Sequence, residues 1–391
     1  MNTPSLPARL HGLDTLRSCA ILLVIAYHFK AFVSGADTFG FLSQIGWSGV
    51  DLFFVLSGYL IGNQIFASLI RQDFSLKVFY SRRFLRTLPN FYVVLALYFL
   101  FPSVMGGNTP PELWRFLSFT QNLGLHTGTA FSHAWSLCIE EQFYLILPAV
   151  ALAFLLTAKH CKKSMAYAWL LLIGLIVSGM LLRGWLWQNL VHNDETFYNY
   201  IYYSSLGRFD ELLPGVALAL IKNYHRQLWQ RLLQWGNQFL VVGMVCVALM
   251  WYLFANFHYL EGQGYTYMMT TVGYSLMAIS FALLVLAALS PRSLLYKVKI
   301  PGCYHLAAWS YAIYLSHKAI FYILKAPFKQ AGIDLESPLA LSVMLLTSLL
   351  AGYLLYRLIE SPFMRLRNTY FSYAPVHEKE KLSVPVGINF N

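Results

Sequence analysis

Charged residues are scarce in this chain. Asp, Glu, Lys and Arg together make up 12% of its 391 residues, whereas they make up about a quarter of a typical soluble domain. Hydrophobic side chains account for 58%. So little charge excludes a large water-exposed surface, and it argues against a mainly disordered chain or one that mainly binds nucleic acid. The composition therefore predicts a polytopic membrane protein built from helices.

The sequence also has few cysteines and lacks the short motifs of nucleotide and metal sites. Its cysteines form no CxxC pair and show no metal-ligand spacing, which predicts neither a disulfide framework nor a bound metal. No P-loop and no glycine-rich nucleotide fingerprint occurs, which argues against an ATP-driven pump. The cysteines stand at Cys19, Cys138, Cys161, Cys246 and Cys303.

Long apolar runs are what the sequence has instead. A membrane helix needs roughly 20 mainly apolar residues, and ten segments meet this need, although proline and charged residues interrupt the third and the sixth. We expect an all-α bundle of about ten transmembrane helices in one domain over 1–368, followed by a mobile cytoplasmic tail over 369–391. The segments are 16–33, 45–66, 88–106, 137–157, 166–187, 203–221, 237–258, 266–290, 304–326 and 338–360.

The net charge of +11 follows this topology. Lys and Arg gather in every second connection, and because basic residues favour the cytoplasmic side, the pattern places both termini in the cytoplasm. A cleaved secretory leader ending near Ser34-Gly35-Ala36 is the alternative, although the first run is long enough to span. The basic residues assigned to the cytoplasm are Arg9, Arg71, Lys77, Arg82, Arg83, Arg86, Lys159, Lys162, Lys163, Lys222, Arg226, Arg231, Arg292, Lys297, Lys299, Arg365, Arg367, Lys379 and Lys381.

Ionisable side chains inside membrane segments are candidates for function, because they usually face the protein interior or a water-filled cavity. Arg17 and His28 lie 11 residues apart in the first segment, which on a helix puts them on one face and roughly 16 Å apart. Glu140 and Glu141 lie near the outer end of the fourth segment, at about the depth of His28. Adjacent helical residues point roughly 100° apart, so one carboxylate can face a cavity while the other makes a structural contact.

Two further segments bring polar residues to this depth. Arg208, Asp210 and Glu211 begin the sixth segment, and His317 lies in the outer half of the ninth. Structural interpretations stand beside the functional one: a packed membrane histidine for His28 or His317, a helix-start cap for the two glutamates, and an ion pair of Arg208 with either acid. The convergence of four segments at one depth favours a functional site.

Two more motifs carry chemistry. Ser57-Gly58 in the second segment forms a small-residue notch that lets another helix or a thin ligand approach. On the cytoplasmic side, Arg83 and Arg86 are three residues apart and form a one-sided fork suited to phosphate, with Arg82 beside them. Topology-setting charge or contact with lipid headgroups is the alternative for these arginines.

At these residues the chain resembles the integral-membrane acyltransferase-3 family, the bacterial O-acyltransferases of surface glycans. The resemblance covers about 9–368 and departs at Tyr59, where phenylalanine is more usual. The matching motifs are Leu13 to Arg17 followed by ten residues and His28, Phe53 to Tyr59, Arg83 to Arg86, Trp135 to Tyr144, Arg208 to Gly215, Tyr311 to His317, and Glu360 to Phe363.

The resemblance implies a donor site and an acceptor site. An acyl-CoA, with acetyl-CoA expected first, would dock from the cytoplasm with its phosphates on Arg82, Arg83 and Arg86 and its pantetheine extending past Arg17. The acceptor would be a hydroxyl of a glycan or glycolipid entering from outside, and no metal is expected. The substrate contacts expected from this comparison are His317, Arg208, Asp210, Glu211, Trp135 and Ser57.

The resemblance also implies the chemistry. His28 would act as general base on the acceptor hydroxyl, because an unperturbed imidazole titrates near neutrality. Glu141 or Glu140 would orient the His28 ring. An acyl-His28 intermediate, with the acyl group handed across in two steps, is the other mechanism, and the sequence leaves both open.

The resemblance places the protein in the bacterial cytoplasmic (inner) membrane, as a multi-pass chain. Some relatives continue into an extracytoplasmic domain, whereas this chain ends about 30 residues after the last segment, so we expect the acceptor chemistry within the membrane domain. A proton-coupled transporter of a sugar or organic anion is the main alternative. Against it, the two halves of the sequence do not resemble each other and the arginine fork has no role. A non-catalytic component of a glycan-assembly complex is a third interpretation.

Overall fold

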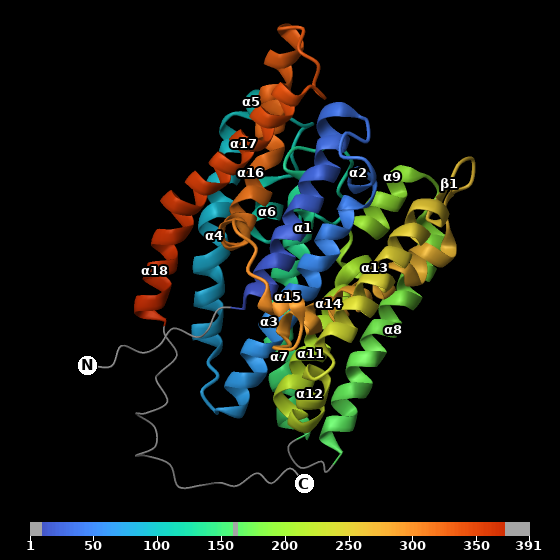
Figure 1. Cartoon of the computed structure of the whole chain (residues 1–391), viewed down its shortest axis with the longest axis vertical. Coiled ribbons are helices and arrows are strands. Elements are labelled where there is room, and N and C mark those ends of the chain that lie inside the picture. Colours follow the sequence, from blue (N-terminus) through green and yellow to red (C-terminus); the bar gives the residue numbers. More distant parts are fainter. Residues whose placement is uncertain (1–9, 159–162, 372–391) are drawn as a thin grey trace.

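Helices make up most of the described molecule (Figure 1). The computed structural model describes residues 10–158 and 163–371. Cys161, most of the expected tail and the basic residues Arg9, Lys159, Lys162, Lys379 and Lys381, which contributed to the orientation argument, lie outside the described residues. The all-α prediction is confirmed for the described part of the chain, where the only strands are a short hairpin, β1 (Tyr259–Leu260) and β2 (Gly264–Tyr265).

The chain forms both long and short helices. The long helices are α1 (His11–Phe29), α3 (Gly49–Ile70), α4 (Leu76–Leu100), α7 (Trp135–Ala158), α8 (Ser164–Leu190), α13 (Gly236–Phe257), α14 (Tyr274–Leu289), α16 (Cys303–Gln330) and α17 (Pro338–Leu355). The short ones are α2 (Phe41–Ile45), α5 (Pro102–Met105), α6 (Leu113–Leu117), α9 (Asp194–Phe197), α10 (Ser205–Arg208), α11 (Leu213–Tyr224), α12 (Arg226–Leu233), α15 (Leu294–Lys297) and α18 (Ser361–Tyr370). Single turns of 3₁₀ or π-helix join several of them: η1 (Lys30–Ser34), η2 (Gly46–Ser48), η3 (Ser132–Ala134), η4 (Tyr198–Tyr202), η5 (Phe209–Leu212), η6 (Met269–Gly273) and η7 (Tyr356–Glu360).

Seven helical segments of the described residues are long and apolar enough to cross a membrane: His11–Ser34, Phe41–Ile70, Ser132–Thr157, Ser164–Leu190, Gly236–Phe257, Met269–Leu289 and Pro338–Tyr370. They match seven of the ten predicted segments. The other three fall on α4, on α10 with α11, and on α16, which are helical but more polar or shorter. These three segments carry the arginine fork, Arg208 and His317, and such polar side chains lower their mean hydropathy.

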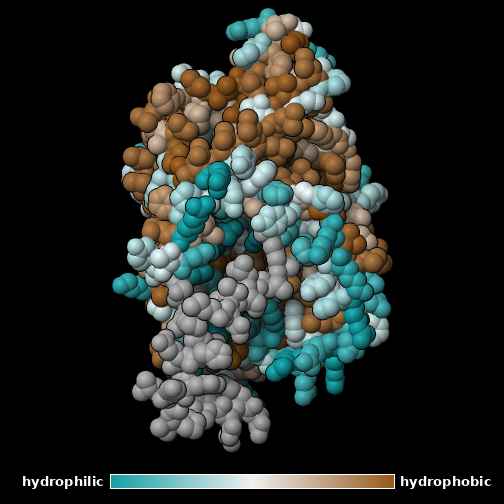
Figure 2. Space-filling view, turned by 60° about the vertical axis from the view of Figure 1, so that its left-hand side comes forward, coloured by the Kyte–Doolittle hydropathy of each residue, from teal (hydrophilic) through white to brown (hydrophobic). Residues whose placement is uncertain are grey.

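The outer surface is apolar over large areas. Figure 2 shows a broad hydrophobic region on the upper half of one face and polar residues gathered below it. Leu181 on α8, Val245 on α13 and Leu346 on α17 are each more than half exposed. Large contiguous apolar surface of this kind indicates a lipid or protein environment rather than water. The composition and the fold therefore agree on a multi-pass membrane protein.

The sixth predicted segment is broken rather than continuous. The chain runs through α10 and η5 and only then forms α11, with Pro214 in the first turn of α11. Proline suits this position because its nitrogen has no proton to leave unpaired there. The three residues around the break, Arg208, Asp210 and Glu211, are fully buried and carry ion pairs described below, and these interactions hold the chain in its path through α10 and η5.

Helix α11 packs closely against α3 through glycines. A Cβ on Gly58 would lie 1.9 Å from the carbonyl oxygen of Leu212, and a Cβ on Gly215 would lie 2.1 Å from the carbonyl oxygen of Val55. No real side chain fits at these distances, so both positions require glycine. The two residues of the small-residue notch therefore have different roles: Gly58 contacts the backbone at the start of α11, and Ser57 faces a cavity.

We expect Gly58→Ala to destabilise the protein by about 1–3 kcal/mol, because the added methyl group forces α3 away from α11. The measurement is the midpoint of thermal unfolding in detergent. Gly174→Ala is the matched control, since a Cβ at Gly174 in the middle of α8 has no atom within 4 Å. Equal midpoints for the two variants would contradict the close packing.

Candidate active site

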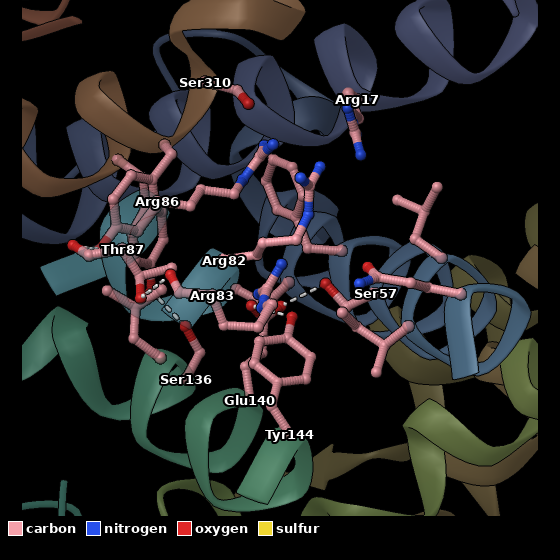
Figure 3. A pocket seen from close by; sticks show the side chains of 18 of the residues that line it. Arg17, Ser57, Arg82, Arg83, Arg86, Thr87, Ser136, Glu140, Tyr144 and Ser310 are labelled. Carbon is pink, nitrogen blue, oxygen red and sulfur yellow. Dashed lines mark hydrogen bonds between the residues drawn. The ribbon is translucent and has the colours of Figure 1, made fainter. Parts of the chain in front are cut away.

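One cavity lies between α1, α3, α4, α7 and α16, with a volume of about 270 Å³ (Figure 3). We call it the inner cavity. Among the described residues, five arginines line it, together with hydroxyl groups, one carboxylate and several apolar side chains. Its polar lining residues are Arg17, Ser57, Gln64, Arg82, Arg83, Arg86, Thr87, Ser136, Glu140, Tyr144, Ser310, Tyr311, Tyr314 and Arg367.

The arginines make the inner cavity strongly cationic. In Figure 3 the guanidinium groups of Arg17, Arg82 and Arg86 point toward one central space. Arg83 lies against the ring of Tyr144, with its guanidinium carbon 3.9 Å from the ring centre. The Nε atom of Arg83 is buried and has no hydrogen-bond partner among the described residues. Several convergent guanidinium groups and an unused donor fit a ligand that carries phosphate groups.

The carboxylate of Glu140, which lines the inner cavity, is held from two sides. Glu140 accepts a hydrogen bond from the hydroxyl of Ser57 at 2.9 Å and another from the hydroxyl of Tyr144 at 2.9 Å. Figure 3 shows this arrangement, with Glu140 between its two donors. Glu141 is half-buried on the neighbouring face of α7 and does not line the cavity. The two glutamates therefore differ in their surroundings, as their positions on a helix predict.

A second cavity of about 340 Å³ lies between α1, η2, η3, α9 and η4. We call it the outer cavity. Its lining contains seven aromatic side chains, two histidines and two acids, and it includes no Lys or Arg from the described residues. The polar and aromatic residues are Tyr27, His28, Phe32, Trp47, Thr127, Ser132, His133, Trp135, Asp194, Glu195, Tyr198, Tyr202 and Tyr203.

His28 is part of a chain of hydrogen bonds that ends on the backbone. His317 Nδ1 lies 2.9 Å from the carbonyl oxygen of Ile313, which only accepts, so Nδ1 carries the proton and donates. In the neutral ring His317 Nε2 is then an acceptor. It lies 2.6 Å from His28 Nδ1, which must donate, and the two rings are within 7° of parallel. We assign the tautomers from these contacts, and they leave His28 Nε2 with a free lone pair.

A third histidine stands beside this pair. His133 in η3 has its ring centre 6.2 Å from that of His28 and 5.5 Å from that of His317. Its Nε2 lies 3.2 Å from the carbonyl oxygen of Leu315, and its buried Nδ1 has no partner in the described structure. His133 was not predicted from the sequence as a residue of the active site. The signal was its position two residues before Trp135, at the start of the motif that ends at Tyr144.

The expected partner of His28 is corrected by the structure. We expected Glu141 or Glu140 to orient the His28 ring, and His317 on α16 makes this contact instead. The physical reason is the packing of the helices. Glu140 lies more than a turn into α7 and bonds to Ser57 of α3, whereas α16 packs along α1 and brings His317 to His28. His317, expected to contact substrate, is thus a buried partner of His28.

Arg208, Asp210 and Glu211 line neither cavity and form structural ion pairs. Arg208 pairs with Glu211 and with Asp51 of α3, and all three side chains are fully buried. Asp210 is bound instead by Arg183 of α8, which also donates to the carbonyl oxygen of Gly207 and to the hydroxyl of Ser275. The substrate contacts expected at these three residues are therefore replaced by ion pairs. Asp51 and Arg183 were not predicted as partners of these residues, because no local sequence pattern indicates which distant residue each of them contacts.

The two cavities meet at a thin partition. Val50 of α3 lines both of them. Two consecutive residues of α7 line different cavities: Trp135 lines the outer cavity and Ser136 lines the inner one. The Ser136 hydroxyl bonds to the hydroxyl of Tyr314 at 2.7 Å, and Tyr314 in turn donates to the carbonyl oxygen of His133. Arg17 and His28 lie on opposite sides of this partition.

Comparison with known proteins identifies the family. The family model described as an acyltransferase domain matches residues 10–357, which is nearly the whole chain. The chain belongs to this acyltransferase family. Membership confirms the resemblance to the integral-membrane acyltransferase-3 proteins. No solved structure matches the chain.

The curated relatives that this chain resembles are named as O-acetyltransferases. Over 234 residues it is 34% identical to the peptidoglycan O-acetyltransferase OatA of Listeria monocytogenes, a match covering 55% of this chain and 34% of that protein. It is 27% identical to the O-acetyltransferase OatA of Staphylococcus aureus over 94% of this chain and 59% of that protein. The putative peptidoglycan O-acetyltransferase YrhL of Bacillus subtilis is 29% identical over 90% and 54% of the two chains. The chain thus spans between a third and three fifths of these relatives' length.

Proposed function

We propose that this acyltransferase moves an acetyl group from cytoplasmic acetyl-CoA, or another short acyl group from its CoA ester, to a hydroxyl of a surface glycan or glycolipid on the outer side. One observation supports this most directly. Arg17 and His28 lie on one helix, yet Arg17 lines a cavity with five arginines and His28 lines a cavity of aromatic and acidic residues. A polyanionic donor and a sugar acceptor fit these two environments.

The proposal includes the placement of the chain in the membrane. Ten spans with both termini in the cytoplasm would put the inner cavity on the cytoplasmic side, where the basic connections lie, and would make the protein a multi-pass component of the bacterial cytoplasmic membrane. The domain over 1–368 would hold both cavities, with a cytoplasmic tail over 369–391.

The donor would be held by charge. Arg82, Arg83 and Arg86 present guanidinium groups toward the inner cavity, and the unpartnered Nε of Arg83 supplies a donor for a phosphate oxygen. Arg17 lines the same cavity from α1, the helix that also carries His28. Thus the phosphate groups of an acyl-CoA would remain at the cytoplasmic mouth while the thioester reaches the partition near Val50.

The acceptor step would use the free lone pair of His28 Nε2. This nitrogen takes the proton of the acceptor hydroxyl, whose oxygen bonds to the thioester carbonyl carbon. The carbon–sulfur bond then breaks, and the proton passes from His28 to the departing thiolate, giving an ester and free CoA. His317 fixes the tautomer that makes this possible, because its Nε2 accepts the proton of His28 Nδ1. An acyl group carried on His28 Nε2 would use the same lone pair.

The acceptor class follows from the relatives' names, which make peptidoglycan the first glycan to test. Membranes containing the protein would be incubated with acetyl-CoA labelled in the acetyl group and with purified peptidoglycan, and ester-linked label would be counted. Label on the glycan supports the proposal. Uptake of a sugar or organic anion into vesicles, with no labelled glycan from any acceptor, would instead indicate a transporter.

For the donor site, we expect Arg83→Gln to raise the KM for acetyl-CoA by about ten- to a hundredfold, because a charge-assisted hydrogen bond contributes about 1.5–3 kcal/mol. The measurement is the initial rate of acetyl transfer against donor concentration. Arg231→Gln, on the exposed face of α12 and with the same change of charge, should leave this KM unchanged. Equal KM values for both variants would remove Arg83 from the donor site.

A further inference from the structure

Part of the outer cavity is lined by aromatic rings that pack against one another, which we call the aromatic wall. The Trp135 ring centre lies 5.0 Å from that of Tyr202 and 5.6 Å from that of Tyr203. Tyr198 lies 5.3 Å from Tyr202 and 5.5 Å from Tyr203. Trp135 comes from the start of α7, and the tyrosines come from η4 and the residue after it. Aromatic side chains locked by one another lose little entropy when a flat ligand stacks on them.

The wall is supported from behind by a buried cation. The guanidinium carbon of Arg208 lies 5.0 Å from the ring centre of Tyr202 and 5.4 Å from that of Trp135. Arg208 itself is fully buried and paired with Asp51 and Glu211. The ion pairs at the break in the sixth segment therefore hold a buried cation against two rings of the aromatic wall.

Two acids stand among the lining residues of the same cavity, at the start of α9. Asp194 and Glu195 are exposed, and Glu195 lies 2.6 Å from the ring nitrogen of His126. Carboxylates accept hydrogen bonds from vicinal hydroxyl groups, and they repel ligands that carry carboxylate or phosphate. The inner cavity is lined mainly by arginines instead, so the linings of the two cavities differ in charge.

We propose that the outer cavity is a subsite for one uncharged sugar ring of the acceptor, stacked on Trp135, Tyr202 and Tyr203, with hydroxyl groups bound by Asp194 and Glu195. The apolar face of a pyranose ring matches an aromatic surface, and its rim of hydroxyl groups matches the acids. A ring held on this wall presents a hydroxyl across the cavity to His28. This inference rests on the proposed function for its catalytic meaning, and sugar binding itself is tested separately.

Binding is measured on the purified full-length chain in detergent, by the change in tryptophan fluorescence, because Trp47 and Trp135 both line the cavity. The neutral probe is a tetramer of N-acetylglucosamine, and the anionic probe is a trimer of galacturonic acid. We expect saturable binding of the neutral probe and at least tenfold weaker binding of the anionic one. Equal or tighter binding of the anionic probe would overturn the proposal.

The aromatic wall is tested with Tyr203→Leu, Tyr203→Phe and Tyr200→Leu. Tyr203→Leu removes a ring from the wall and should weaken binding of the neutral probe about tenfold and raise the acceptor KM to match, with the KM for acetyl-CoA unchanged. Tyr203→Phe keeps the ring and should behave like wild type. Tyr200 lies on the same turn of π-helix but points outward, with 38% of its surface exposed, and Tyr200→Leu should change nothing.

The acids are tested with the double variant Asp194→Asn/Glu195→Gln, which should bind the anionic probe at least threefold better than wild type does. Loss of neutral-probe binding in Tyr200→Leu, or wild-type binding in Tyr203→Leu, would contradict the subsite. If wild type binds the neutral probe but transfers no acetyl group to any glycan, the proposed function fails and the sugar subsite stands. If it transfers acetyl groups but Tyr203→Leu leaves the acceptor KM unchanged, the subsite alone fails.

Discussion

His28→Ala is expected to lower the rate of acyl transfer by about 10² to 10⁴-fold, the usual contribution of a positioned general base. The structural reason is that His28 Nε2 has a free lone pair at the outer cavity, while the ring is fixed through Nδ1 by His317. The measurement is ester-linked label on the glycan from labelled acetyl-CoA, normalised to the amount of folded protein. The KM for acetyl-CoA should stay the same, because His28 lines the outer cavity and not the inner one.

His305→Ala is the matched control, since His305 lies on α16 but is exposed, and it should leave the rate unchanged. Variants of His317 test how the ring of His28 is held. His317→Gln keeps an oxygen that can accept the His28 Nδ1 proton and should retain more activity than His317→Leu. A wild-type rate of transfer by His28→Ala would show that His28 takes no part in the mechanism. Equal rates for the two His317 variants would show that the hydrogen bond from His28 Nδ1 to His317 does not contribute to catalysis.

Arg208→Met is expected to cost about 3–5 kcal/mol of folding stability, because it leaves Asp51 and Glu211 buried without their counter-charge. The readout is the fraction of protein that stays monodisperse in detergent after heating. The triple variant Arg208→Met/Asp51→Asn/Glu211→Gln should recover part of the lost stability, because it contains no unpaired buried charge. Arg231→Met on the exposed face of α12 is the control for loss of an arginine.

The same variant separates two roles for Arg208. If Arg208→Met unfolds at the wild-type temperature and only raises the acceptor KM, then Arg208 binds substrate, as the sequence comparison implied, and the structural assignment is wrong. If stability falls and the rescued triple variant regains both folding and acceptor binding, then the ion pairs act by holding the aromatic wall of Trp135 and Tyr202.

The membrane class and most of the helices were predictable because hydropathy is a local property of the chain. Seven predicted segments fall on long apolar helices in the described residues. The division between Glu140 and Glu141 was predictable for a similar reason, since neighbouring residues on a helix must face different surroundings. The break at Pro214 was visible as an interruption, but its path through α10 and η5 was not, because buried ion pairs with other helices determine it.

The sequence by itself determined that the chain enters a membrane, that Arg17 and His28 share one helical face, and that Arg83 and Arg86 form a fork, since each of these follows from local spacing and composition. Only the tertiary structure decided that His28 pairs with His317, 289 residues away, and that Arg208 pairs with Asp51, 157 residues away. It alone divided the site into a cationic cavity and an aromatic one. The physical reason is that these contacts depend on which helices pack together, and the local spacing of residues does not indicate which helices will be in contact.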